Sequence, residues 1–177
     1  MKRILLIATG GTIACKQTAS GLAPQLGAKE LLSYVRDRAE NVESIELFRM
    51  DSSNVQPEEW RAIAQAVADN MHKADGIVIT HGTDTMAYTS SMLSFMLRGI
   101  KIPVVLTGAQ YPMGMDGSDA AANLGDALTA ARELSGGVYI AFGGSVILGC
   151  RAPPSLLFFL SSKTFFVINS NSIGAIP

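Results

Sequence analysis

Four short polar segments, each at or just after the end of a predicted strand, hold the side chains that could do chemistry. They are residues 9–12 (Thr-Gly-Gly-Thr), 51–53 (Asp-Ser-Ser), 80–84 (Thr-His-Gly-Thr-Asp) and 107–110 (Thr-Gly-Ala-Gln). Their hydroxyl and backbone N–H groups can bind a carboxylate, the Asp84 carboxylate can bind an amine, and a hydroxyl can attack a carbonyl. The set suits a small substrate that carries all three groups.

A purely structural role is open for any single segment. Thr12, Ser53 and Thr83 could cap helices, and the glycines could simply make tight turns. Three such segments with carboxylates among them favour a site over a set of unrelated caps.

An alternation of strands and helices must position these segments. The apolar runs predict strands at residues 4–8, 44–48, 76–80, 103–107, 138–142 and 145–148, and helical spacing predicts helices at 29–38, 57–71, 86–97 and 118–134. Near-continuous apolar strands alternating with helices are typical of an α/β fold with a largely parallel sheet covered by helices. In such sheets ligands bind beyond the carboxyl ends of the strands.

Composition argues against several classes of protein. The 177 residues, 48% hydrophobic, suit one globular domain, and 14 basic against 15 acidic side chains offer no basic stripe for nucleic acid. Nothing approaches the roughly 18 consecutive apolar residues that would span a membrane. The apolar run at 4–8 is too short for the core of a signal peptide, so the cytoplasm is expected.

Metal and cofactor sites are not predicted. The chain has neither GxGxxG nor GxxxxGK, His72 and His81 lack metal-ligand spacing, and the two cysteines are far apart. We expect His81 to be a supporting hydrogen-bond donor, Cys15 a small core or loop residue, and Trp60 a core residue.

Two segments together point to a family. Residues 8–14 (Ala-Thr-Gly-Gly-Thr-Ile-Ala) and 80–85 (Thr-His-Gly-Thr-Asp-Thr) resemble the two signature motifs of the bacterial-type L-asparaginases and related glutaminase-asparaginases. The likeness, in the style of the cytoplasmic type I enzymes, continues through residues 51–54, 106–110, Asp126 and 150–152. It implies a three-layer asparaginase-type amino-terminal domain over residues 1–152.

The resemblance also implies a cofactor-free amide hydrolysis. Thr12 matches the nucleophile, which attacks the side-chain amide of asparagine to give an acyl-enzyme that water then hydrolyses. Thr83 and Asp84 match the family's second catalytic threonine and aspartate, and Asp84 also holds the substrate ammonium.

Three further positions match substrate-binding residues. Ser52 matches the residue that binds the α-carboxylate, while Gly11 and Ala109 would contribute backbone contacts, Gly11 near the oxyanion. The family acts as homo-oligomers, and the oligomeric state of this chain stays open.

Two departures from the family pattern concern activity. The family places a lysine shortly after its Gly-x-Arg stretch, whereas here Arg151 is followed by Ala-Pro-Pro-Ser, and Lys163 lies too far along. The family's mobile loop usually carries a tyrosine near Gly21, which this chain lacks, although Tyr111 or Tyr139 could substitute. Because a threonine hydroxyl needs a base near pH 7, we expect little or no turnover.

The last stretch, residues 153–177, differs from the rest in composition. It has Lys163 as its lone charge and most of the phenylalanines. We expect an aberrant apolar tail from a truncated or frameshifted reading frame, with the family's carboxyl-terminal domain missing.

Two alternative functions stay open for the chain. It could be a non-catalytic α/β domain that at most binds aspartate or a partner subunit, or an asparaginase-like amidotransferase subunit that acts on aminoacylated tRNA.

Overall fold

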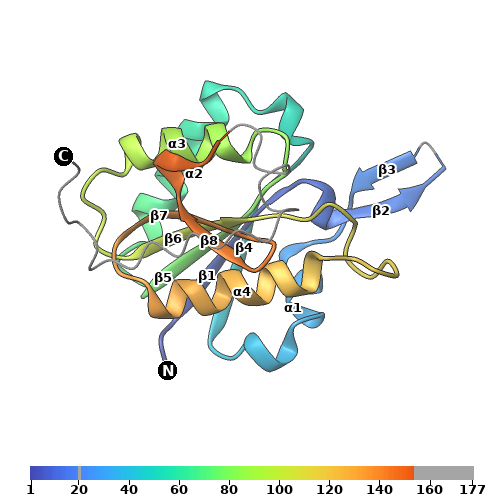
Figure 1. The fold of residues 1–177 in the computed structure, drawn as a ribbon, viewed down its shortest axis with the longest axis horizontal. Helices are drawn as coiled ribbons and strands as arrows, with labels where there is room; N and C mark the ends of the chain where they lie inside the picture. Colours follow the sequence, from blue (N-terminus) through green and yellow to red (C-terminus); the bar gives the residue numbers. More distant parts are fainter. Residues whose placement is uncertain (20, 154–177) are drawn as a thin grey trace, which may run out of the picture.

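A six-stranded, mostly parallel sheet forms the centre of the protein (Figure 1). The computed structural model describes residues 1–19 and 21–153. The sheet order is β4 (Val42–Met50), β1 (Ile4–Gly10), β5 (Gly76–Thr80), β6 (Pro103–Thr107), β7 (Gly137–Phe142) and β8 (Ser145–Leu148). All neighbours pair in parallel except β8, which runs antiparallel to β7. The predicted α/β fold class is therefore confirmed.

Helices cover both faces of the sheet. α1 (Ala28–Ser33) and α4 (Ala120–Glu133) pack on one face, and α2 (Pro57–Asn70) and α3 (Met86–Met96) pack on the other (Figure 1). Successive side chains of β1 alternate between the two cores, with Leu6 facing α4 and Ile7 facing α2 and α3. Because both faces are covered, the central strands are apolar almost throughout.

Local sequence explains α2, although one of its residues differs from expectation. Pro57 takes the first position, where it loses no hydrogen bond, and Gln56 N–H donates to Glu59 Oε2 at 2.8 Å. Val67 is buried as predicted. The prediction that Trp60 is a core residue is wrong: it is half-buried, and its indole N–H donates to Thr89.

The chain between the first predicted strand and the first predicted helix also differs from expectation. No element was predicted between residues 9 and 28, but the structure has a hairpin there, formed by β2 (Cys15–Thr18) and β3 (Gly21–Pro24), that projects from the body (Figure 1). Its strands bury little of either face, so no alternating apolar pattern marks them. The helix expected at 29–38 ends at Ser33 and gives way to a 3-10 turn, Arg36–Arg38.

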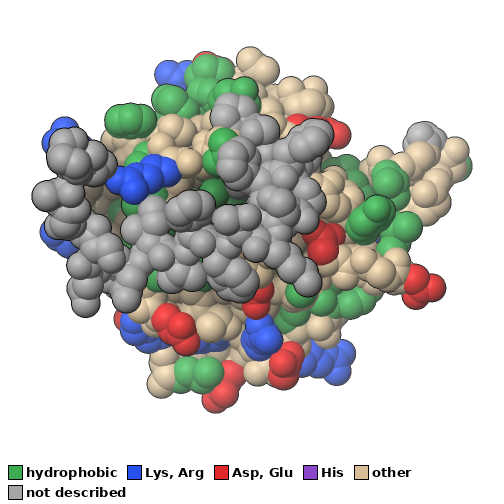
Figure 2. Space-filling model, viewed as in Figure 1, with side chains coloured by type: hydrophobic (Ala, Val, Ile, Leu, Met, Phe, Trp, Pro, Cys, Tyr) green, Lys and Arg blue, Asp and Glu red, His purple; other side chains and the backbone are tan. Residues whose placement is uncertain are grey.

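The predicted tail lies outside the described residues, except for Pro153. Within the described part of the chain, none of the helices combines the length and the hydrophobicity needed to cross a bilayer. On the face drawn in Figure 2, basic and acidic side chains are interspersed over the coloured part of the surface.

Candidate functional site

The strand order brings the predicted site segments to one edge of the sheet. The segments of Ser52, Thr12, Thr83 and Ala109 follow β4, β1, β5 and β6, which are consecutive neighbours in the sheet. Since these strands are parallel, all four segments leave the sheet at its carboxyl edge.

The segments of Thr12 and Thr83 pack directly against each other. Gly11 has φ +77°, and a Cβ placed on it would lie 2.6 Å from Gly82 Cα and 2.7 Å from the His81 carbonyl carbon. Glycine is required here by both the backbone conformation and the close approach. Chain segments about 70 residues apart in the sequence thus meet at a backbone-to-backbone contact.

The segment of Ser52 joins the same contact from the other side of Gly82. A Cβ on Gly82 would lie 2.6 Å from Ser52 Cβ, so the buried serine occupies the space that a larger residue would need. Thr85 Oγ1 donates to the Ser52 carbonyl at 2.8 Å, and Gly11 N–H donates to the Met50 carbonyl at 3.0 Å. Three of the four polar segments therefore form one packed unit.

The fourth segment is held by the start of α4. Asn123 Nδ2 donates to the Gly108 carbonyl at 3.0 Å and to Asp119 Oδ2 at 2.9 Å. Asp119 Oδ1 in turn accepts from the backbone N–H groups of Gln110 and Tyr111 at 3.0 and 3.1 Å.

The same segment also packs closely on the segment of Thr83. Gly108 approaches His81 so closely that a Cβ on it would clash with the His81 carbonyl. Ala109 is fully buried beside it. The loop after β6 is therefore held both by α4 and by its neighbour in the sheet.

The structural alternative of helix caps fails for the three hydroxyls. The 3-10 turn Thr12–Ala14 and helix α3 begin without a side-chain cap bond, and at the turn Ser52–Asn54 the cap is the Asp51 carboxylate, which accepts from Ser53 N–H. Within the described residues, the hydroxyls of Thr12 and Thr83 form no hydrogen bond. Both threonines are half-buried and Asp84 is exposed, so solutes can reach this edge.

Two ionisable groups near Thr12 have shifted pKa values. Burial, and then the negative charge of Asp51, raise the pKa of the Cys15 thiol, whose Sγ lies 3.5 Å from the Gly11 carbonyl. Hydrogen bonds from Ser53 N–H and Ser53 Oγ lower the pKa of Asp51. At neutral pH Cys15 is therefore a buried neutral thiol, as expected of a small core or loop residue.

His81 lies beneath the site rather than in it. The ring is fully buried, with Nδ1 at 2.7 Å from the Gly82 carbonyl and Nε2 at 3.0 Å from Thr89 Oγ1. Burial lowers the pKa of His81, although the bond with Gly82 opposes that effect. A neutral, buried imidazole fits the predicted supporting role and not a catalytic one. Its partner Thr89, which lies on α3, was not predicted, because no local pattern pairs the two residues.

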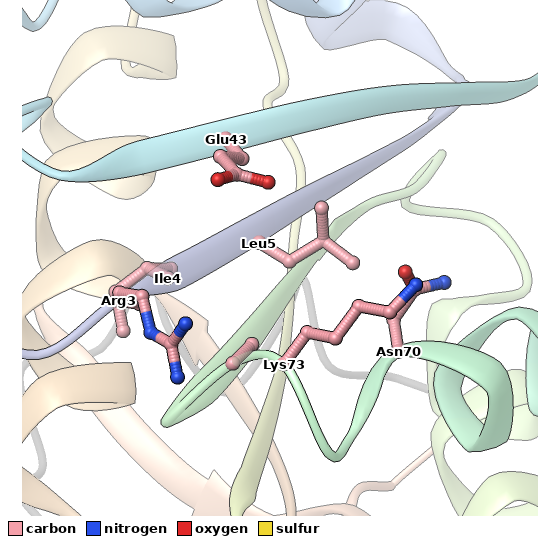
Figure 3. Close-up of a pocket in the computed structure, with 7 residues that line it drawn as sticks. Arg3, Ile4, Leu5, Glu43, Asn70 and Lys73 are labelled. Atoms are coloured by element: carbon pink, nitrogen blue, oxygen red, sulfur yellow. The ribbon is translucent and has the colours of Figure 1, made fainter.

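A hollow at the opposite edge of the sheet is too small to bind a small-molecule ligand. It lies between the starts of β1 and β4 and the end of α2, with Arg3, Glu43 and Lys73 around it (Figure 3). Its volume is about 30 Å³, whereas small-molecule pockets usually exceed about 300 Å³. Across residues 1–19 and 21–153, no three His, Cys, Asp or Glu side chains gather as a metal site would require.

Fold and site together define a three-layer α/β protein with a polar site at the carboxyl edge of a parallel sheet. Residues 3–158 match the sequence model of the asparaginase N-terminal domain, so the chain belongs to the asparaginase family. This match confirms the resemblance seen in the two signature motifs.

Individual relatives agree with that assignment. An L-asparaginase from Thermococcus kodakarensis is 46% identical over 152 residues, which are 84% of this chain and 46% of the relative. Its structure superposes with a TM-score of 0.77, covering 83% of this chain and 46% of that one. L-asparaginase I from Vibrio cholerae gives a TM-score of 0.72 at 36% identity, covering 86% and 48%.

A second group of relatives consists of glutamyl-tRNA(Gln) amidotransferase subunits. One from Methanococcus vannielii is 36% identical over 151 residues, 82% of this chain and 35% of the relative. The chain thus spans about half the length of the asparaginases it matches, and about a third of this amidotransferase relative.

Proposed function

We propose that the chain carries the nucleophile domain of an L-asparaginase-type amidohydrolase, which converts L-asparagine and water to L-aspartate and ammonia. The observation that carries this proposal is the packing of Gly11 on Gly82, which joins the segment of Thr12 to that of Thr83 and Asp84. Neither threonine hydroxyl bonds to another described residue, which supports the proposal, as does the 46% identity to an L-asparaginase.

The proposed reaction has two steps and needs no cofactor. Thr12 Oγ attacks the carboxamide carbon of asparagine and forms a C–O bond, the C–N bond breaks, and the nitrogen leaves as ammonia after taking up the proton that the Thr12 hydroxyl loses. Water then attacks the resulting ester, releasing aspartate and restoring the Thr12 hydroxyl. Thr83 and Asp84 serve as the second catalytic group. Gly11 is the backbone contact proposed near the oxyanion, and its N–H would have to leave the Met50 carbonyl to donate there.

Charge complementarity supports the role proposed for Asp84 in substrate binding, while those of Ser52 and Ala109 rest on the family resemblance. Asp84, exposed at the site edge, would hold the substrate ammonium, and Ser52 would bind the α-carboxylate. Ala109 would offer a backbone contact from a loop fixed by Asn123 and Asp119. Binding both charged ends would fix the carboxamide relative to Thr12.

The missing lysine supports a proposal of weak turnover. The family lysine is not found after Arg151, where Ala152 and Pro153 follow, and no other described cation bonds to the hydroxyl of Thr12 or Thr83. A threonine hydroxyl that no base or cation activates is a poor nucleophile at neutral pH.

The direct test is ammonia release from asparagine, with glutamine as a second substrate. We expect a slow rate, far below that of the Thermococcus kodakarensis enzyme measured alongside, and a fall to the uncatalysed background in Thr12→Ala. Thr129→Ala is the matched control, because Thr129 lies on α4 and donates to the Gly125 carbonyl. A rate equal to that of the Thermococcus kodakarensis enzyme would contradict weak turnover. A Thr12→Ala rate equal to wild type would contradict the nucleophile assignment.

The two alternatives remain distinguishable by experiment. A binding-only domain is favoured by the lysine gap, and it would give a calorimetric signal with aspartate but no ammonia. An amidotransferase function is favoured by the second group of relatives, yet 36% identity is weaker than 46%, and a net charge of −1 offers little attraction for tRNA. Ammonia release that requires aminoacylated tRNA would favour it.

The proposed setting is the cytoplasm, and the proposed assembly is a homo-oligomer. Both cysteines are free, and Cys150 is an exposed thiol, which suits a reducing compartment. The family relation supports self-association. Light scattering with size-exclusion chromatography would measure the assembly, and a monomer at micromolar concentration would contradict it.

A further inference from the structure

A hydrogen-bond chain connects α2 and α3 to the segment of Thr83. Trp60 Nε1 donates to Thr89 Oγ1 at 3.0 Å, Thr89 Oγ1 lies 3.0 Å from His81 Nε2, and His81 Nδ1 lies 2.7 Å from the Gly82 carbonyl. Thr89 and His81 are both fully buried. The proposed reaction uses none of the three side chains in this hydrogen-bond chain.

The donor and acceptor types of the four groups determine where each hydrogen of this hydrogen-bond chain lies. The Gly82 carbonyl can only accept, so His81 Nδ1 must carry the hydrogen. In the neutral ring Nε2 then accepts, and the hydrogen it receives comes from the Thr89 hydroxyl. Indole N–H is a donor only, and it fills a remaining lone pair of Thr89 Oγ1. Each polar atom has a partner in this single arrangement.

The end of the hydrogen-bond chain controls the peptide between Gly82 and Thr83. A trans peptide is planar and directs its C=O and N–H in opposite directions, so holding the Gly82 carbonyl also fixes the direction of Thr83 N–H. Among residues 1–19 and 21–153, nothing accepts a hydrogen bond from that N–H. Gly82 itself, packed between Gly11 and Ser52, has no side chain to restrain the peptide.

We propose that Trp60, Thr89 and His81 are positioning residues that lock the Gly82–Thr83 peptide, and with it Thr83, in the orientation the site uses. The orientation of the peptide follows from the contacts above, whereas its use in substrate binding rests on the proposed function. His81 thus acts through the backbone and not by proton transfer.

Two substitutions of His81 separate this role from general packing. His81→Asn can place its amide N–H near the Nδ1 position and keep the bond to Gly82, whereas His81→Gln places its amide near Nε2 and loses that bond. A matched pair exists at the next member of the hydrogen-bond chain, since Thr89→Ser keeps the hydroxyl and Thr89→Val removes it at nearly constant shape.

The first measurement is nitrogen NMR of the full-length protein and needs no activity. We expect wild-type His81 to be protonated at Nδ1 and unprotonated at Nε2. The Thr83 amide resonance should move in His81→Gln and Thr89→Val, and stay near wild type in His81→Asn and Thr89→Ser. A hydrogen on Nε2, or equal movement within each pair, would overturn the proposal.

The second measurement is aspartate affinity by calorimetry, normalised to folded protein. Loss of one hydrogen bond predicts a Kd about tenfold higher for His81→Gln, with His81→Asn within about twofold of wild type. Equal affinities would show that the locked peptide does not serve binding. If wild type neither binds aspartate nor releases ammonia, the proposed function fails, and the NMR comparison still decides whether the peptide is locked.

Discussion

Single residues at the site owe their identities to close backbone approach as much as to chemistry. Gly11 and Gly82 touch, Ser52 fills the space on the far side of Gly82, and Gly108 meets the His81 carbonyl. None of these contacts involves a reactive group. They set the spacing between segments whose hydroxyls and carboxylate would do the chemistry, so small residues are needed beside the reactive ones.

Replacing Gly11 tests this spacing through stability. Gly11→Ala would place a Cβ against the Gly82 backbone at a φ of +77°, combining a left-handed conformation with a clash. We expect the free energy of unfolding in urea to fall by about 3 kcal/mol.

Gly27→Ala is the control for that substitution. Gly27 has a φ of −77°, and a Cβ placed on it would lie 3.1 Å from Glu46 Oε2, at the end of a side chain that can move. We expect a change below about 0.5 kcal/mol. Similar losses for both variants would mean that the contact between Gly11 and Gly82 is not as tight as described.

Whole elements matter because their ends hold the loops. The start of α4 supplies Asp119 and Asn123, which bind the loop after β6, and Asn123 Oδ1 also accepts from Gly143 N–H at 2.9 Å in the turn between β7 and β8. One buried amide thus connects a helix to two loops.

Removing that amide should cost stability through unpaired groups. Asn123→Ala leaves the buried Gly108 carbonyl without this donor, and we expect unfolding in urea to become easier by about 2 kcal/mol. Asn70→Ala, which loses a bond to the Ala66 carbonyl near the end of α2, should change stability by less than about 0.5 kcal/mol. Equal effects of the two substitutions would argue against a special role for Asn123.

For the whole molecule, the buried His81 links folding to pH. Burial is the main cause that lowers the pKa of His81 in the folded state. Below about pH 6.5 the His81 ring is therefore protonated in the unfolded chain but still neutral in the folded protein. Stability contributed by the neutral ring is therefore complete above that pH and is lost as the pH falls toward the folded-state pKa.

Urea unfolding between pH 5.5 and 6.5 measures this linkage. We expect wild type to lose up to about 1.4 kcal/mol per pH unit more than His81→Asn over this range. Identical slopes for wild type and His81→Asn would show that the ring takes up its proton in the folded state.

Local patterns in the sequence were enough for the sheet and its helices, and for locating the polar segments. Strands such as Gly76–Thr80 and Pro103–Thr107 were predicted with the observed bounds, because apolar runs and helical spacing depend only on near neighbours. The hairpin of Cys15–Thr18 and Gly21–Pro24 was missed for the converse reason, since its strands bury little of either face.

Contacts between distant segments had to come from the folded chain. That Gly11 touches Gly82, that Thr89 meets His81, and that Trp60 stays half-exposed all depend on strand order and helix placement. Periodicity shows that a residue faces a core or a loop, but its partner there lies tens of residues away and is selected by packing. The sequence was therefore enough to predict which residues belong to the site. Their arrangement arises only when parallel strands bring them to one edge of the sheet.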